Sequence, residues 1–173
     1  MTHAPAAPST SAPTDATSDE HFHALTLITA AVAAAATFAT IVLGIPTWAA
    51  FLGWVGYSVS GPTTREGVAN LISFLLGLGF GMGTGLSIER LTPSLGDAAT
   101  PLLIFGVTVL VMSLRRLTPI NNPLAYFLGL ICFFASAQMA SITLLTMLAP
   151  AGALGAFSAW LVSVLYSRLQ RAA

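Results

Sequence analysis

Glycine occupies every second position from Gly77 to Gly85, in the stretch GLGFGMGTG. Glycine-rich backbone can do chemistry in two ways: a turn between a strand and a helix cradles a phosphate group, or an extended loop lines an ion path with carbonyl oxygens. The stretch lacks the GxGxxG and GxxxxGK[ST] spacings of phosphate cradles, and it lies inside a hydrophobic run. A carbonyl filter stays open as an alternative, supported only by the residues GTGL.

The same spacing has a simpler meaning on a helix, where residues four apart share a face. Gly77, Gly81 and Gly85 then form one face, and Gly79 and Gly83 form a second face about 200° away. Small residues let membrane helices approach closely. We therefore expect these five glycines, the glycine ladder, to be a packing surface between two close neighbours, one of which could belong to another subunit.

A second set of candidates consists of uncharged polar side chains within or beside the hydrophobic runs. Such groups, together with breaks that expose backbone carbonyls, can line a narrow polar path. The alternative is structural: hydroxyls bond their own helix backbone, amides bridge neighbouring helices, and aromatic rings form the core. The candidate path residues are Ser60, Asn70, Ser136 and Gln138, and the candidate constriction consists of Tyr57 and Phe133.

The sequence offers little for catalysis or for a metal ion. The three histidines, His3, His21 and His23, lie near the N-terminus, and no nucleophile stands beside a general base. No Asp, Glu, Lys or Arg falls in the middle of a hydrophobic run, which argues against a proton-coupled pump. The single cysteine, Cys132, is expected to be a small core residue. We expect no enzyme activity, no metal and no cofactor.

The elements that position these residues follow from the composition. Hydrophobic residues make up 55% of the 173 residues and charged residues 7%, with a mean hydropathy of +0.84. Soluble domains carry about 25% charged residues, so this chain lacks the charge to cover a water-facing surface. We expect an all-α, polytopic membrane protein whose main partner is the lipid bilayer. The formal net charge of zero leaves no basic patch for nucleic acid.

A transmembrane helix needs about 20 apolar residues to cross about 30 Å of hydrocarbon. Prolines and polar residues separate six such runs, two of them short, in a single domain of residues 23–170. Residues 1–22 are rich in Ala, Pro, Ser and Thr, a composition typical of a disordered tail. The six predicted transmembrane helices are about 23–44, 46–61, 66–91, 96–114, 123–137 and 141–169.

The placement of arginine predicts the orientation of these helices. Five arginines fall on the side that carries both termini and the connections after the second and fourth helices, and only Arg90 falls on the other side. Positive charge favours the cytoplasmic side. Both termini are therefore expected in the cytoplasm. A re-entrant second helix would move Arg115 and Arg116 outside and weaken this pattern.

The two short helices resemble each other. TWAAFLGWVGYSVSG (47–61) aligns without gaps to PLAYFLGLICFFASA (123–137) at a shift of 76 positions, with five identical pairs that include Gly53/Gly129 and Ser60/Ser136. The alignment predicts two three-helix repeats, residues 23–91 and 96–169. Because each repeat has an odd number of crossings, the second is inverted relative to the first. We expect Gly53 and Gly129 to mark close helix contacts.

The stretch TWAAFLGWVGYSVSG, with a Gly/Thr-rich loop and a glycine-rich helix after it, resembles a family of small bacterial inner-membrane proteins catalogued as domain of unknown function 1097. FLGLICFFAS is similar to the second characteristic stretch of that family. The resemblance covers roughly residues 25–168. It implies a bacterial inner-membrane location, and it implies nothing about a substrate because that family has no established activity.

Two functions remain open from the sequence. The inverted repeat, the short helices and the lack of buried charge favour a passive channel or facilitator for a small neutral solute. The many packing glycines favour a non-transporting membrane scaffold or accessory subunit. In the channel, Ser60, Ser136 and Gln138 would converge on one cavity near the pseudo-two-fold axis, whereas Phe51 and Phe127 would fill a dry axis in the scaffold. A homo-oligomer is expected in either case.

Overall fold

A computed structural model describes residues 14–59, 61 and 63–172, and these residues form helices without any strand. The predicted all-α class is thereby confirmed for the described part of the chain. In chain order the elements are α1 (Thr14–Leu43), α2 (Thr47–Ser58), α3 (Thr64–Leu95), the 3-10 helix η1 (Gly96–Ala98), α4 (Ala99–Leu114), α5 (Pro123–Ala135) and α6 (Ile142–Ala172).

Local signals in the sequence start two of these helices. The Thr63 hydroxyl accepts a hydrogen bond from the Glu66 N–H at 3.3 Å and donates one to the Glu66 carboxylate at 2.7 Å, which caps α3. The Asn122 side chain accepts from the Leu124 N–H at 3.2 Å, and Pro123 takes the first position of α5. Both helices therefore begin where the chain itself satisfies their free N–H groups.

Helix α1 begins earlier than expected. It starts at Thr14, so the predicted disordered tail of residues 1–22 overlaps its first turns. The rest of the predicted tail, residues 1–13, lies outside the described residues.

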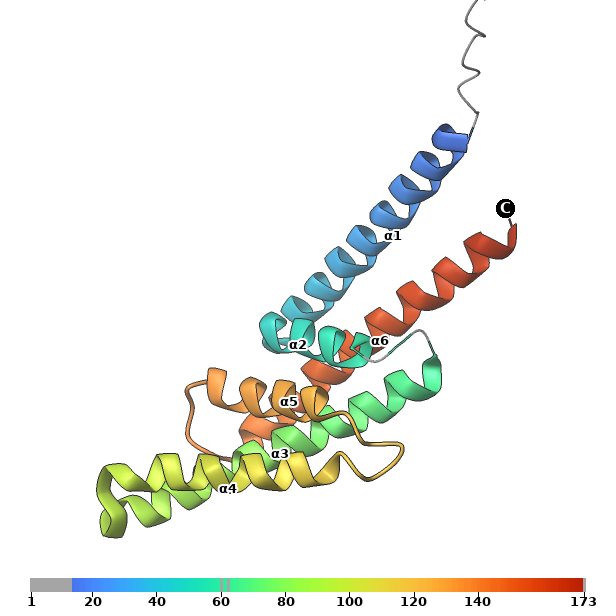
Figure 1. Ribbon diagram of the computed structural model, residues 1–173. Helices are drawn as coiled ribbons and strands as arrows, with labels where there is room; N and C mark the ends of the chain where they lie inside the picture. Colours follow the sequence, from blue (N-terminus) through green and yellow to red (C-terminus); the bar gives the residue numbers. More distant parts are fainter. Residues whose placement is uncertain (1–13, 60, 62, 173) are drawn as a thin grey trace, which may run out of the picture.

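The two longest inner helices, α3 and α6, cross near the centre of the molecule (Figure 1). Each carries one short helix along its side: α2 packs on α6, and α5 packs on α3. Helix α1 flanks α6, and α4 flanks α3. The helices thus form two groups, which we call the α6 bundle (α1, α2, α6) and the α3 bundle (α3, α4, α5). Each short helix pairs with a long helix from the other half of the sequence.

The connections gather at two opposite ends of the molecule (Figure 1). The start of α1, the α2–α3 and α4–α5 connections and the C-terminus lie toward the right, at what we call the Glu66 end. The α1–α2, α3–α4 and α5–α6 connections lie toward the left, at the Gln138 end. One contact within the Gln138 end joins the Ala140 N–H to the Glu89 carboxylate at 3.5 Å. Successive helices therefore run between the two ends in alternation.

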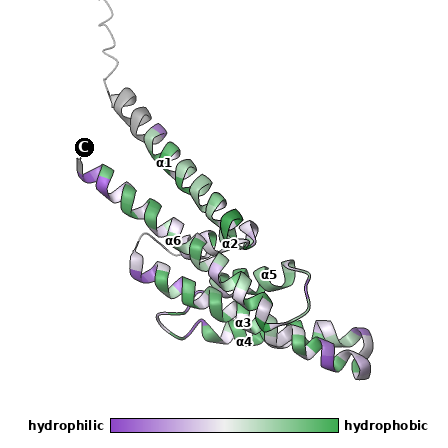
Figure 2. Ribbon diagram, turned by 180° about the vertical axis from the view of Figure 1, so that it is seen from behind, coloured by the Kyte–Doolittle hydropathy of each residue, from purple (hydrophilic) through white to green (hydrophobic). Residues whose placement is uncertain are grey.

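Three segments among the described residues are long and apolar enough to cross a membrane: His23–Leu43, Thr64–Leu114 and Ile142–Arg171. Helix α5 is a shorter apolar helix. Large apolar side chains point outward from the flanking helices, such as Phe38 on α1 and Phe105 on α4, each 68% exposed. Apolar residues make up most of the described helices in Figure 2. This surface is typical of a protein in contact with lipid.

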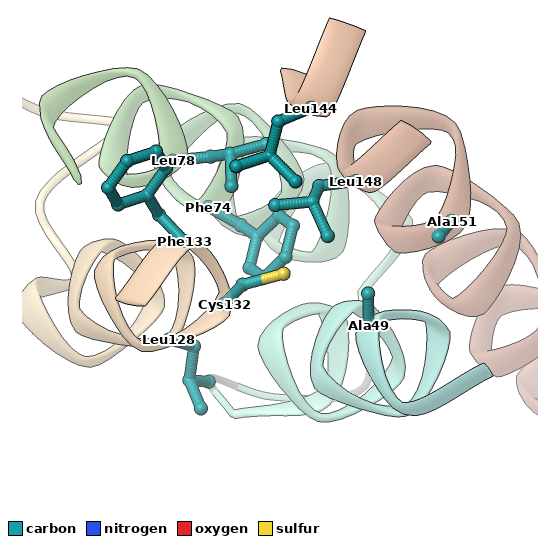
Figure 3. Packing of buried hydrophobic residues seen from close by; sticks show 9 residues of the cluster. All are labelled: Ala49, Phe74, Leu78, Leu128, Cys132, Phe133, Leu144, Leu148 and Ala151. Carbon is teal, nitrogen blue, oxygen red and sulfur yellow. The ribbon is translucent and has the colours of Figure 1, made fainter. Parts of the chain in front are cut away.

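The main core lies where the two bundles meet (Figure 3). Its buried members include Phe74 and Leu78 on α3, Cys132 on α5 and Leu148 on α6. Ala49 contributes from α2, so all four inner helices share this cluster. Phe74 is fully buried, and its ring lies between Cys132 and Leu148 in Figure 3. The centre of the molecule is therefore filled by buried apolar side chains.

Candidate functional site

Glycine brings the backbones of paired helices into direct contact. A side chain at Gly53 on α2 would overlap the carbonyl oxygen of Gly152 on α6, and a side chain at Gly129 on α5 would overlap the carbonyl oxygen of Phe74 on α3. Only hydrogen fits at either glycine. Such approach increases van der Waals contact between helices where lipid supplies no hydrophobic driving force.

Each helix pair has a second contact of the same kind. Gly155 on α6 lies against the Ala50 carbonyl of α2, and Gly77 on α3 lies against the Tyr126 carbonyl of α5. Each of these contact residues on α5 lies 76 positions after its counterpart on α2. Each contact residue on α6 lies 78 positions after its counterpart on α3. We call these contacts the α2–α6 clasp (Ala50, Gly53, Gly152, Gly155) and the α3–α5 clasp (Phe74, Gly77, Tyr126, Gly129).

The glycine ladder packs on one of its two faces within the chain. Gly77 belongs to the α3–α5 clasp, and Gly81 and Gly85 lie against the ring of Phe133. On the other face, a side chain at Gly79 or Gly83 would meet no atom within 4 Å. These two glycines line a groove of about 380 Å³ between α3 and α4, so the second packed face that we expected is open here because α4 stands away from it.

The Gln138 end holds a cleft of about 270 Å³, which we call the Gln138 cleft. Ser136 and Gln138 supply its polar side chains, and the start of α2 and the first turns of α6 complete it. The chain turns sharply here: Ala137 has a φ of 51°, and the Ser136 hydroxyl accepts from the Gln138 N–H at 3.3 Å. The lining residues are Gly44, Pro46, Trp48, Ala135, Ser136, Gln138, Leu144, Met147 and Leu148.

The opposite end holds a second cleft, of about 530 Å³, which we call the Glu66 cleft. It lies between the N-terminus of α3 and the connection from α4 to α5. Unlike the Gln138 cleft, it carries both signs of charge, on Arg65 and Glu66. Its described lining consists of Thr63, Arg65, Glu66, Ala69, Thr118, Pro119 and Asn121.

Asn70 closes the space between the Glu66 end and the core. The residue is 3% exposed; its side-chain N–H donates to the Tyr57 carbonyl at 3.4 Å, and its side-chain oxygen accepts from the Asn122 amide at 3.2 Å. The Tyr57 ring packs directly on Gly67, leaving no room for a side chain there. Asn70 thus joins the end of α2 to α3 and to the start of α5.

The residues of the candidate polar path fall into two separate places. Ser136 and Gln138 meet in the Gln138 cleft, whereas Asn70 lies toward the Glu66 end. Ser60 lies outside the described residues. Of the two candidate constriction residues, Tyr57 packs beside Asn70, with its ring on Gly67. Phe133 packs on the glycine ladder. The described candidates therefore do not share one cleft.

Phe74 lies in the main core, where α3 meets α6 and α2. Its ring lies on Gly152 and against Gly56, so α6 and α2 leave space for it where they carry no side chain. Leu148, which lines the Gln138 cleft, belongs to the same buried cluster. Asn70 lies one turn earlier on α3, toward the Glu66 end. Sequence reasoning missed Phe74 because its type fits any apolar core.

Polar side chains buried within the helices have their hydrogen bonds satisfied. The hydroxyls of Ser73, Thr84 and Ser158 donate to carbonyls one turn earlier on their own helices, at 3.0, 2.8 and 2.9 Å. No buried side-chain nitrogen or oxygen in the described part of the chain lacks a partner. Among those same residues, no group of three His, Cys, Asp or Glu side chains is placed to hold a metal ion. The described residues therefore offer two clefts and a packed apolar core.

The model of a family described as "Protein of unknown function (DUF1097)" matches residues 26–163, which spans all of the clefts and clasps described above. No curated protein and no solved structure matches the chain.

Proposed function

The chain belongs to the DUF1097 family, and we propose that it acts as a passive facilitator for a small, uncharged solute in a membrane. The observation that carries this proposal is the pair of clefts at opposite ends of the molecule. The Gln138 cleft reaches, through Leu148, the buried cluster that contains Phe74. A closed centre of this kind is what a gated path presents when it is shut.

The proposal includes six membrane crossings arranged as two inverted three-helix repeats. The alternating course of the helices and the constant offsets of the two clasps support it. So do the helix bounds, since α2 (Thr47–Ser58) and α5 (Pro123–Ala135) begin 76 positions apart. At about 1.5 Å per residue these two helices reach only about 18–20 Å. The start of α2 and the end of α5 both lie at the Gln138 cleft, which shortens the hydrocarbon distance that each helix must cross.

We propose that the Glu66 end faces the cytoplasm of a bacterial cell, across its inner membrane. Five arginines fall at that end, at positions 65, 115, 116, 168 and 171, whereas Arg90 lies at the Gln138 end. Both termini are then cytoplasmic. Fusions at each terminus test this: a fluorescent protein that matures only in the cytoplasm should be bright on both, and alkaline phosphatase activity at either terminus would contradict the orientation.

The chemistry of the described surfaces restricts the class of solute. The Gln138 cleft carries a hydroxyl and an amide but no charge, and the core at Phe74 is wholly apolar. An ion would lose its hydration there without compensation. A small neutral molecule that forms few hydrogen bonds would lose far less. The proposed solutes are therefore small and uncharged.

Stopped-flow light scattering on proteoliposomes tests the facilitator. Permeability to water or to one of a panel of small neutral solutes should exceed that of empty liposomes. Ala135→Trp places a bulky ring in the Gln138 cleft and should lower this permeability. Ile131→Trp is the matched control, since Ile131 is 51% exposed on the same helix and does not line the cleft. Equal permeability in the two variants would contradict a path through the cleft.

A non-transporting scaffold or accessory subunit is the second candidate. The fully partnered polar groups of the described core and the backbone contacts in the clasps favour it, since both are what a rigid packing unit needs. Correctly folded protein that raises no permeability for any solute would select this function. The predicted homo-oligomer stays a prediction, and light scattering after size-exclusion chromatography measures it directly.

A further inference from the structure

We infer that Phe74 sets the size limit of the proposed path, an inference that rests on the facilitator proposed above. The residue is fully buried on α3 at the crossing of α3 and α6. Its ring reaches across to α6, where a side chain at Gly152 would overlap it. One aromatic ring therefore fills the space that two helices would otherwise share.

Position 152 is the counterpart of position 74 in the two clasps. The Phe74 carbonyl receives Gly129 in one clasp, and the Gly152 carbonyl receives Gly53 in the other. Phe74 and Gly152 therefore face each other across the pseudo-two-fold axis relating the clasps. Because α3 carries the large Phe74 where α6 carries Gly152, a single ring can occupy the space at the axis.

The buried cluster that contains this ring extends to the Gln138 cleft. Leu148 lines the cleft and belongs to the buried cluster that contains Phe74 and Cys132. Removing the ring therefore opens space beside the Cys132 thiol, which is fully buried in the present structure. Cys132 is the single cysteine of the chain, so its thiol reports access to the centre without engineering.

The first experiment compares Phe74→Ala with wild type in proteoliposomes. Phe74→Ala should admit neutral solutes larger than those that wild type passes, with a permeability gain of about tenfold. A small methanethiosulfonate reagent should label Cys132 faster by a similar factor. Leu78→Ala is the matched control, because Leu78 is buried one turn further along α3, whereas the three atoms nearest to a side chain at Gly152 all belong to Phe74. It should leave both the size limit and the labelling rate near wild type.

The second experiment moves the ring across the axis. Phe74→Gly combined with Gly152→Phe places an aromatic ring in the same space from the opposite helix. This double variant should restore slow labelling and the wild-type size limit, whereas Phe74→Gly alone should behave like Phe74→Ala. A role confined to general core stability would not predict such a rescue.

The outcomes distinguish a failure of the size limit proposed for Phe74 from a failure of the proposed transport function. Faster labelling of Cys132 without permeability to any solute would contradict the facilitator function. It would still show that the Phe74 ring closes the core. Unchanged labelling and an unchanged size limit in folded Phe74→Ala would overturn the inference, even if wild type transports. If the double variant restores both the slow labelling and the wild-type size limit, it would support the size limit set by Phe74. It would also support the inverted relation of α3 and α6.

Discussion

The two faces of the glycine ladder have the same composition and the same spacing, yet they meet different surroundings. On the inner face, Gly77 touches the backbone of α5, and Gly81 touches the ring of Phe133. On the outer face, Gly79 and Gly83 border an open groove beside α4. The difference teaches that a small-residue pattern permits close packing, and that the partner helix decides whether it occurs.

The inner face finds its partner because α5 also carries a glycine, Gly129, at the point of contact. The outer face meets α4, whose bulky Leu103 and Leu110 line the groove together with Gly106. Close approach thus requires small groups on both helices at the same height.

The largest effect should come from the same substitution made on each face of the ladder in turn. Gly77→Leu would drive a branched side chain into the Tyr126 carbonyl, and we expect loss of folded protein or destabilisation by about 3 kcal/mol. Gly79→Leu should change stability by no more than about 0.5 kcal/mol, since its side chain enters open space. Thermal unfolding of the purified variants in detergent measures both. Equal losses would show that the ladder is packed on both sides.

The equivalence of the two clasps makes the next prediction. Gly77→Ala and Gly155→Ala each place a methyl group against a backbone carbonyl, of Tyr126 and Ala50 respectively. Each should cost about 2 kcal/mol, and the two costs should agree within about 0.5 kcal/mol. The same unfolding assay compares them. A large cost for one and a small cost for the other would contradict the proposed inverted relation between the clasps.

A polar bridge is the rival explanation for the tight inner packing, and Asn70 tests it. Asn70→Leu removes the hydrogen bonds to Tyr57 and Asn122 and should cost about 1–3 kcal/mol, less than Gly77→Leu. Ser73→Ala is its control, since the Ser73 hydroxyl bonds only the Ala69 carbonyl of its own helix and should cost about 0.5 kcal/mol. An Asn70 variant less stable than Gly77→Leu would assign the packing to polar contacts.

The smallest effect should be a gain in stability on the outer face. Gly83→Ala adds a methyl group where no atom lies within 4 Å, and it removes the flexibility of glycine in the unfolded chain. We expect stabilisation of up to about 1 kcal/mol. Gly81→Ala, whose methyl group would crowd the Phe133 side chain, should instead lose stability. If Gly83→Ala loses stability as well, the groove is packed in solution, and cross-linking would test whether a second copy of the chain occupies it.

Several features were predictable because their causes are local. Pro46 and Pro123 mark the starts of α2 and α5, and the Thr63–Glu66 pair marks the start of α3. The high hydropathy and the low charge were enough to predict apolar helices. These signals act within a few residues, so they can be recognised without knowledge of the partners.

The candidate site was harder to predict because its contacts join distant segments. Asn70 and Asn122 are 52 positions apart, and nothing near either residue indicates their hydrogen bond. The pairing of α2 with α6 rather than with α3 also depends on glycines far along the chain, at 152 and 155. The role of Phe74 follows only once Gly152 is known to lie opposite, since an isolated phenylalanine in an apolar run carries no such signal.

Because each short helix packs on a long helix from the other half of the sequence, the order of synthesis delays the first of these contacts. Gly53 and Gly152 are 99 positions apart in the sequence. At about 5–20 residues per second, a ribosome needs about 5–20 s to produce the second after the first. Throughout that interval α2 has been made, but the helix it docks against has not. The last helix to be synthesised completes the first half of the protein, so a chain that stops short of Gly152 leaves its earliest short helix unpaired and open to quality-control proteases.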